Sequence, residues 1–198
     1  MEKYILPNNR ILVINADDYP ENPRSWDNLG TMACFHNRYN LGDNNIPFSS
    51  DEFDSWKEME DYIINKLDAA VVLPMYMYDH SGITINTTGF SCPWDSGQIG
   101  FIYVTKEKLR KDYNVKRITK DLLDKATRCL LSEVATYDQY VTGDVYRFEI
   151  LKQEVCDKEC THEEVEDSCS GFYGSDIKEN GILDHICEED LKAVLEQL

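Results

Sequence analysis

The sequence lacks the features that assign many chains to a protein class directly. Its longest uninterrupted apolar run, Ala69 to Leu73, is far shorter than the roughly 20 residues that a membrane-spanning helix needs. It contains no glycine-rich phosphate loop, no dinucleotide fingerprint and no His-Glu-x-x-His motif. We therefore do not expect a membrane-spanning protein, a P-loop kinase, a dehydrogenase or a zinc protease.

The cysteines form no regular disulfide framework. There are seven, an odd number, at positions 34, 92, 129, 156, 160, 169 and 187. Such spacing is typical of reduced thiols in a cytosol and not of a secreted disulfide scaffold. The segment Met1 to Ile5 also has no basic stretch followed by an apolar core. We therefore expect free thiols and a cytoplasmic location.

Basic residues are too few to balance the acidic ones. The chain has 20 Lys and Arg against 37 Asp and Glu, a net charge of −17. Residues 144–198 carry −11 and residues 15–68 carry −8, whereas residues 105–128 carry +5. An acidic field of this strength disfavours nucleic acid or an anionic membrane as a direct ligand and favours a basic partner. The alternative is a charge that serves solubility alone.

The hydrophobic patterns predict one α+β domain over residues 1–198. Period-two alternation and short apolar runs predict a mostly antiparallel sheet of about five or six strands. Residues 99–104 are apolar on both faces, which predicts a central strand. Three or four helices should pack on the sheet, and in one of them, capped by Thr119, the buried stripe is Leu123, Ala126, Leu130, Val134 and Tyr137. Residues 156–167 should form the acidic tip of a long hairpin.

Two groups of carboxylates are the predicted partner-binding surfaces. Ser49 and Glu52 have capping-box spacing, and they predict a helix whose solvent face carries the first group. The hairpin tip carries the second group. The first group consists of Asp51, Asp54, Glu58 and Asp61, and the second of Asp157, Glu159, Glu163, Glu164, Glu166 and Asp167.

A nucleophilic site is the alternative to a binding surface. Cys92 or Ser96 could be activated by His80, with Asp79 or Asp95 as the orienting carboxylate. A thiolate nucleophile needs a base within hydrogen-bond reach and a carboxylate behind that base. No local cysteine-protease signature or Gly-x-Ser-x-Gly elbow accompanies these residues, so packing or capping roles are the competing interpretation.

No cofactor is predicted, but one set of residues could hold zinc. Cys156, Cys160, His162 and Cys169 supply four soft ligands within fourteen positions. The first pair has a spacing common in tetrahedral zinc sites, although a second close pair is missing. The alternative is a hairpin tip whose acidic side chains face water.

Four motifs stand out at residues 26–32 (Trp-Asp-Asn-Leu-Gly-Thr-Met), 78–82 (Tyr-Asp-His-Ser-Gly), 90–100 (Phe-Ser-Cys-Pro-Trp-Asp-Ser-Gly-Gln-Ile-Gly) and 168–174 (Ser-Cys-Ser-Gly-Phe-Tyr-Gly). In these motifs the chain resembles an uncharacterised family of proteins from phages and prophages of Gram-positive bacteria. The resemblance covers most of the chain, and its most specific motif is Cys-Pro-Trp-Asp-Ser-Gly-Gln at residues 92–98. It implies a phage gene acting inside an infected bacterium and carries no activity.

Charge and resemblance together lead to one hypothesis and two alternatives. We expect an acidic phage protein that inhibits a host defence nuclease, of the anti-CRISPR or anti-restriction type, in the cytoplasm of the infected bacterium. A small hydrolase or transferase using Cys92 and His80 is the first alternative. A virion structural or assembly protein is the second.

Overall fold

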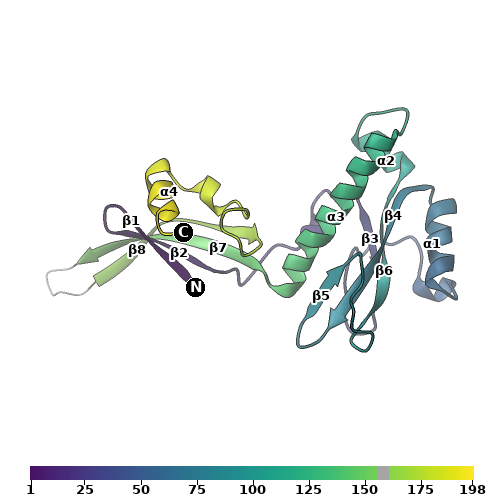
Figure 1. The fold of residues 1–198 in the computed structure, drawn as a ribbon, viewed down its shortest axis with the longest axis horizontal. Helices are drawn as coiled ribbons and strands as arrows, with labels where there is room; N and C mark the ends of the chain where they lie inside the picture. The colour runs from purple at the N-terminus through teal and green to yellow at the C-terminus, as the bar shows by residue number, and fades with distance from the viewer. Residues whose placement is uncertain (156–160) are drawn as a thin grey trace. The chain divides into compact units, whose positions relative to one another are not determined.

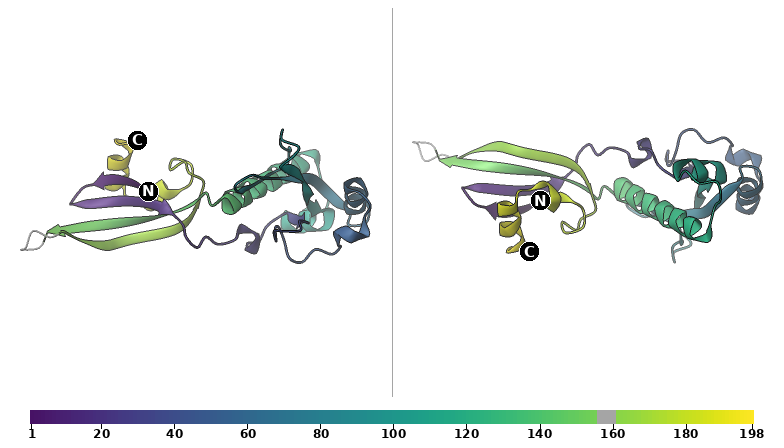
Figure 2. Two further views of the ribbon diagram at one scale, coloured as in Figure 1. Left: turned by 90° about the horizontal axis from the view of Figure 1, so that it is seen from below. Right: turned by 90° about the horizontal axis from the view of Figure 1, so that it is seen from above.

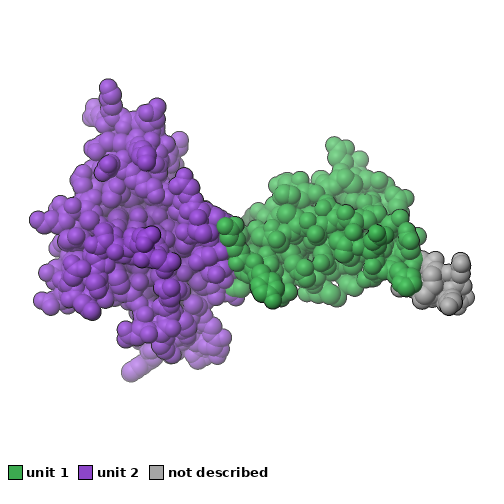
Figure 3. Space-filling model, turned by 180° about the vertical axis from the view of Figure 1, so that it is seen from behind, with its two compact units in different colours: residues 1–21, 143–198 green, residues 22–142 purple. Residues whose placement is uncertain are grey.

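The chain folds into two compact units, each with its own antiparallel sheet. The computed structural model describes residues 1–155 and 161–198. Unit 1 combines residues 1–21 with residues 143–198, and unit 2 consists of residues 22–142 (Figure 3). The α+β class is confirmed, but the described residues form eight strands in two four-stranded sheets and not the predicted five or six strands in one sheet. The prediction of one domain over residues 1–198 did not anticipate a unit built from both ends of the chain.

The sheet of unit 1 has the strand order β1-β2-β7-β8. Its strands are β1 (Glu2–Leu6), β2 (Arg10–Ala16), β7 (Val145–Val155) and β8 (Thr161–Tyr173). Pro7, Asn8 and Asn9 join β1 to β2, and Asn8 and Asn9 have φ of 61° and 58°, the left-handed region that Asn adopts more readily than most residues. Of the predicted hairpin tip, residues 161–167 belong to β8 and residues 156–160 lie outside the described part of the chain.

The C-terminal segment covers one face of this sheet. It contains η3 (Ile182–His185) and α4 (Glu188–Leu195), which lie over the strands in Figures 1 and 2. Leu12, Phe148 and Ile182 are central in the resulting core. Arg10 binds Asp190 of α4 with two hydrogen bonds of 3.0 and 2.7 Å. The Gln197 side chain both accepts from and donates to the backbone of Ile5, so it covers part of the outer edge of β1.

Unit 2 has helices on both faces of its sheet, whose strand order is β3-β6-β4-β5. The strands are β3 (Thr31–Cys34), β4 (Ala69–Asp79), β5 (Ile83–Asn86) and β6 (Ser96–Thr105). The helix α1 (Trp56–Asn65) packs on one face, and α2 (Lys106–Asp112) and α3 (Lys120–Thr142) pack on the other (Figure 1). The predicted central strand is confirmed, because β6 lies between β3 and β4. Along α3 the buried stripe begins at Leu122 instead of Leu123.

A buried ion-pair network holds the first loop of unit 2 in place. This loop contains η1 (Pro23–Ser25). The Arg24 side chain is only 4% exposed and pairs with Asp43 at 2.7 Å and with Glu133 of α3 at 3.0 Å. Glu133 also accepts from the backbone N–H groups of Leu29 and Gly30. These contacts satisfy the buried charges and tie residues 22–43 to α3.

Candidate functional site

The first predicted carboxylate group does not lie on one continuous helix. Ser49 and Glu52 form the predicted capping box, but they cap η2 (Ser50–Glu52), and a separate helix, α1, begins at Trp56. Phe53 interrupts the helix because its ring packs against those of Phe48 and Tyr62, with centroids 5.7 and 5.2 Å apart. The prediction of one helical acidic face was therefore wrong.

The four carboxylates of this group are exposed, and two of them have local partners. Asp51 lies in η2 and Asp54 in the connection to α1, while Glu58 and Asp61 lie on α1. Glu58 accepts a hydrogen bond of 2.9 Å from the backbone N–H of Asp54, and Asp61 pairs with Lys57 at 2.9 Å. Part of the negative charge on this surface is therefore already paired with groups of the same segment, and is less available to a partner protein.

The second carboxylate group is more concentrated. Glu163, Glu164, Glu166 and Asp167 are exposed residues of β8, an edge strand of the unit 1 sheet. Asp157 and Glu159 lie outside the described residues. Within five positions this strand therefore presents four carboxylates beside a sheet edge that no strand of the described chain covers.

Among the described residues, few cations neutralise the carboxylates of β8. Arg10 lies 3.9 Å from Glu166, and Glu163 accepts from Gln153 at 3.1 Å. Lys152, which is opposite Glu164 in the sheet, instead forms a 2.9 Å pair with Glu154 of its own strand. The hydrogen bond from Lys152 lowers the pKa of Glu154, and the same contact raises the pKa of Lys152.

The fold separates the charge of the chain between its two units. Unit 1 contains 20 acidic and 7 basic residues, a net charge of −13, although it has only 77 of the 198 residues. Unit 2 contains 17 acidic and 13 basic residues, a net of −4. The acidic character is therefore mainly a property of unit 1, which the sequence order concealed because this unit is assembled from the two ends of the chain.

The structure brings Cys92, Asp95 and His80 together, with the carboxylate in the middle. Oδ2 of Asp95 accepts from the Cys92 thiol at 3.7 Å and lies 3.3 Å from Nδ1 of His80. A catalytic thiol instead has the imidazole next to the sulfur and the carboxylate behind the imidazole. In the observed order no imidazole of the described residues is hydrogen-bonded to the thiol, so the arrangement does not favour the hydrolase or transferase alternative.

The other residues of the predicted nucleophilic site have different partners. Asp79 accepts from Arg38 and from the hydroxyl of Tyr39 instead of orienting His80. Ser96 donates its hydroxyl hydrogen to the carbonyl of Cys92. A cavity of about 260 Å³ adjoins these residues, and Trp94 beside it is 91% exposed. The geometry thus describes a polar surface loop and not an assembled catalytic triad.

The five described cysteines are free thiols, as expected. Cys34 packs on β3 with its sulfur 3.8 Å from that of Met75, and burial raises the pKa of its thiol to about 12. Burial also raises the pKa of Cys129, with a further contribution from Glu133. Cys34 is therefore protonated at neutral pH and serves the packing of unit 2.

The predicted zinc ligands are not brought together in the described chain. His162 and Cys169 both lie on β8, opposite Glu154 and Phe148. Seven residues of a strand span about 23 Å, so these two side chains cannot bind one ion. Cys156 and Cys160 lie outside the described residues. Within residues 1–155 and 161–198 no cluster of three potential metal ligands occurs.

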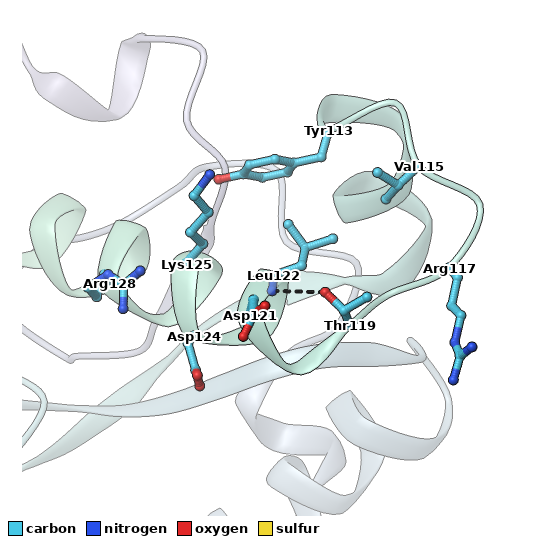
Figure 4. Close-up of a pocket in the computed structure, with 9 residues that line it drawn as sticks. All are labelled: Tyr113, Val115, Arg117, Thr119, Asp121, Leu122, Asp124, Lys125 and Arg128. Atoms are coloured by element: carbon cyan, nitrogen blue, oxygen red, sulfur yellow. Dashed lines mark hydrogen bonds between the residues drawn. The ribbon is translucent and has the colours of Figure 1, made fainter.

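Sequence motifs gave no indication of a cavity of about 520 Å³ at the start of α3 (Figure 4). The signal that could have located it is the basic composition of residues 105–128, because these residues surround it. The lining residues are Tyr113, Val115, Arg117, Thr119, Asp121, Leu122, Asp124, Lys125 and Arg128.

Comparison with family models, with curated proteins and with solved structures finds no match to this chain. In the described part of the chain, no helix combines the length and the apolar character needed to cross a membrane.

Proposed function

We propose that this chain is a binding protein without catalytic activity, which engages a basic protein partner through the carboxylates of β8. The partner that fits the phage resemblance is a host defence nuclease, as in anti-CRISPR or anti-restriction inhibition. A nucleic-acid-binding nuclease carries a basic channel that gains much of its affinity from charge neutralisation. A strand that presents four carboxylates in five positions offers such a channel a substitute for phosphates.

The observation that carries this proposal is the concentration of negative charge in unit 1. A net charge of −13 on one compact unit exceeds what an even acidic coat would place there, since the larger unit 2 carries only −4. The reversed order of Cys92, Asp95 and His80 supports a binding function over the enzymatic alternative. The outer edge of β8 pairs with no other strand of the described chain, so an extended partner segment can add to the sheet there.

The test is a pulldown from the host bacterium, followed by affinity measurement with the purified partner. The triple variant E163K/E164K/E166K should lose at least about tenfold in affinity, because it replaces attraction by repulsion. Binding of the unmodified chain should also weaken between about 0.05 and 0.5 M salt.

A matched control is D51K/D54K/D61K, which changes the net charge by the same amount on unit 2. It should retain most of the affinity. Equal losses in both variants, or a bound partner that is not basic, would contradict the proposal. A stable symmetric oligomer that binds no host protein would instead favour the virion alternative.

A further inference from the structure

Nine of the 13 Lys and Arg residues of unit 2 have no ion-pair partner among the described residues, and seven of these nine form one group. Within the described residues, Lys57, Lys106 and Arg24 each pair with a carboxylate, but none of the seven does. They also lie close together in sequence, across the end of α2 and the start of α3. The seven are Arg110, Lys111, Lys116, Arg117, Lys120, Lys125 and Arg128.

Three of these cations line the 520 Å³ cavity, whose volume is within the range of small-molecule sites. Lys125 and Arg128 come from α3, and Lys125 extends toward the hydroxyl of Tyr113, whereas Arg117, in the segment between the helices, lies at the opposite end of the lining with its side chain directed away from Tyr113 (Figure 4). The three are exposed side chains, so a ligand can reach them from solvent. Their common charge predicts an anionic ligand group, to which guanidinium and ammonium groups bind as hydrogen-bond donors.

The same cavity has an apolar and aromatic wall. Leu122 is buried and points toward the ring of Tyr113, and Val115 lies beside them (Figure 4). The Tyr113 side chain is 37% exposed and extends across the cavity toward Lys125. An aromatic ring beside cations is suited to a planar group stacked on the ring and joined to an anion.

Two carboxylates complete the lining and restrict the ligand further. Asp121 and Asp124 would repel a ligand that is anionic throughout. They can instead accept hydrogen bonds from ligand hydroxyl or amino groups. The Thr119 hydroxyl is assigned no contact with the ligand, because it accepts from the backbone N–H of Leu122 at 3.3 Å and so caps α3.

We propose that this cavity binds a small phosphorylated ligand with a planar ring and hydrogen-bond donors, a free nucleotide. Lys125 and Arg128, three residues apart on α3, bind its phosphates, Tyr113 stacks on its ring, and Asp121 and Asp124 accept from its hydroxyl or amino groups. The site lies within unit 2, and it does not depend on the proposed function of the β8 carboxylates.

Calorimetric titration of the full chain with ATP, inorganic triphosphate and adenosine tests this assignment. ATP should bind saturably and more tightly than either fragment, because only ATP uses both the cations and the ring. Triphosphate binding as tightly as ATP would show that Tyr113 contributes nothing. Binding of a single-stranded DNA oligomer without binding of ATP would equally contradict a nucleotide site, as would the absence of any heat of ATP binding.

Variants separate the two halves of the site. Y113A should weaken ATP at least about fivefold, as expected for loss of one aromatic stack, and leave triphosphate unchanged. K125E/R128E should weaken both ATP and triphosphate by about tenfold or more. The control K66E alters an exposed lysine of the same unit, away from the cavity, and should bind ATP normally. Equal affinity in all variants would overturn the proposal, with circular dichroism confirming that each is folded.

Discussion

Gly100 occupies a point on β6 where the backbone of β3 leaves no room for a side chain. A Cβ atom placed there would lie 1.8 Å from the carbonyl oxygen of Ala33 and 2.9 Å from its carbonyl carbon. Both atoms belong to the backbone, so neither can rotate away. The pairing of β3 with β6, which ends at Cys34 and Gly100, therefore depends on the absence of a side chain at this position.

We expect G100A to lower the free energy of unfolding by about 1–3 kcal/mol or more, the cost of inserting an extra carbon into packed structure. The matched control is G97A in the same strand, where a Cβ atom would meet no heavy atom within 4 Å. Urea denaturation followed by tryptophan fluorescence measures both. Equal stability of G100A and G97A would show that β3 shifts without cost.

At the scale of elements, one ion pair anchors α4 to the sheet of unit 1. Asp190 is 1% exposed, and its two oxygens accept from Nη1 and Nη2 of Arg10, whose side chain is 17% exposed. Glu166, at 3.9 Å, is the other carboxylate near Arg10. Because α4 is short, this pair and the burial of Val194 hold it on the strands.

We expect D190A to destabilise unit 1 by about 3–5 kcal/mol, because the guanidinium of Arg10 is left without its buried partner. The double variant R10M/D190L removes both charges and should recover part of that loss. The control is E189A, which changes the exposed neighbour of Asp190 and should alter the stability of unit 1 only slightly. Thermal unfolding followed by circular dichroism gives the comparison, and a double variant no more stable than D190A would contradict it.

At the scale of the whole molecule, each unit contains a complete core. The buried clusters of unit 2 draw all their members from residues 29–141, and the cluster of unit 1 draws its members from residues 4–14 and 146–194. Unit 2 is continuous in sequence and 121 residues long, a length at which many domains fold alone.

We therefore expect a fragment of residues 22–142 to fold without the rest of the chain. All three tryptophans, Trp26, Trp56 and Trp94, belong to this fragment. Its urea-induced change in tryptophan fluorescence should be cooperative and close to that of the full chain. A fragment with the circular dichroism of an unfolded chain would show that unit 2 needs unit 1.

Hydrophobic periodicity and helix-capping residues, which are patterns within a few residues of sequence, were enough to predict several helices and strands. Ile99 to Val104, apolar on both faces, is the central strand, and Thr119 caps the long helix whose stripe includes Ala126, Leu130 and Val134. The capping box at Ser49 was also visible, although the packing of Phe53 ended that helix early. Periodicity and capping depend on neighbours within a few residues, and for this reason a sequence reveals them.

The sequence by itself determined the α+β class, the acidic character and most of the helices and strands. Only the tertiary structure decided that β2 pairs with β7, which joins the two ends of the chain into one acidic unit. It likewise decided that Asp95 stands between Cys92 and His80, and that Tyr113 and Lys125 line one cavity. Such contacts join residues through space with no local periodic signal, because they depend on how completed elements pack.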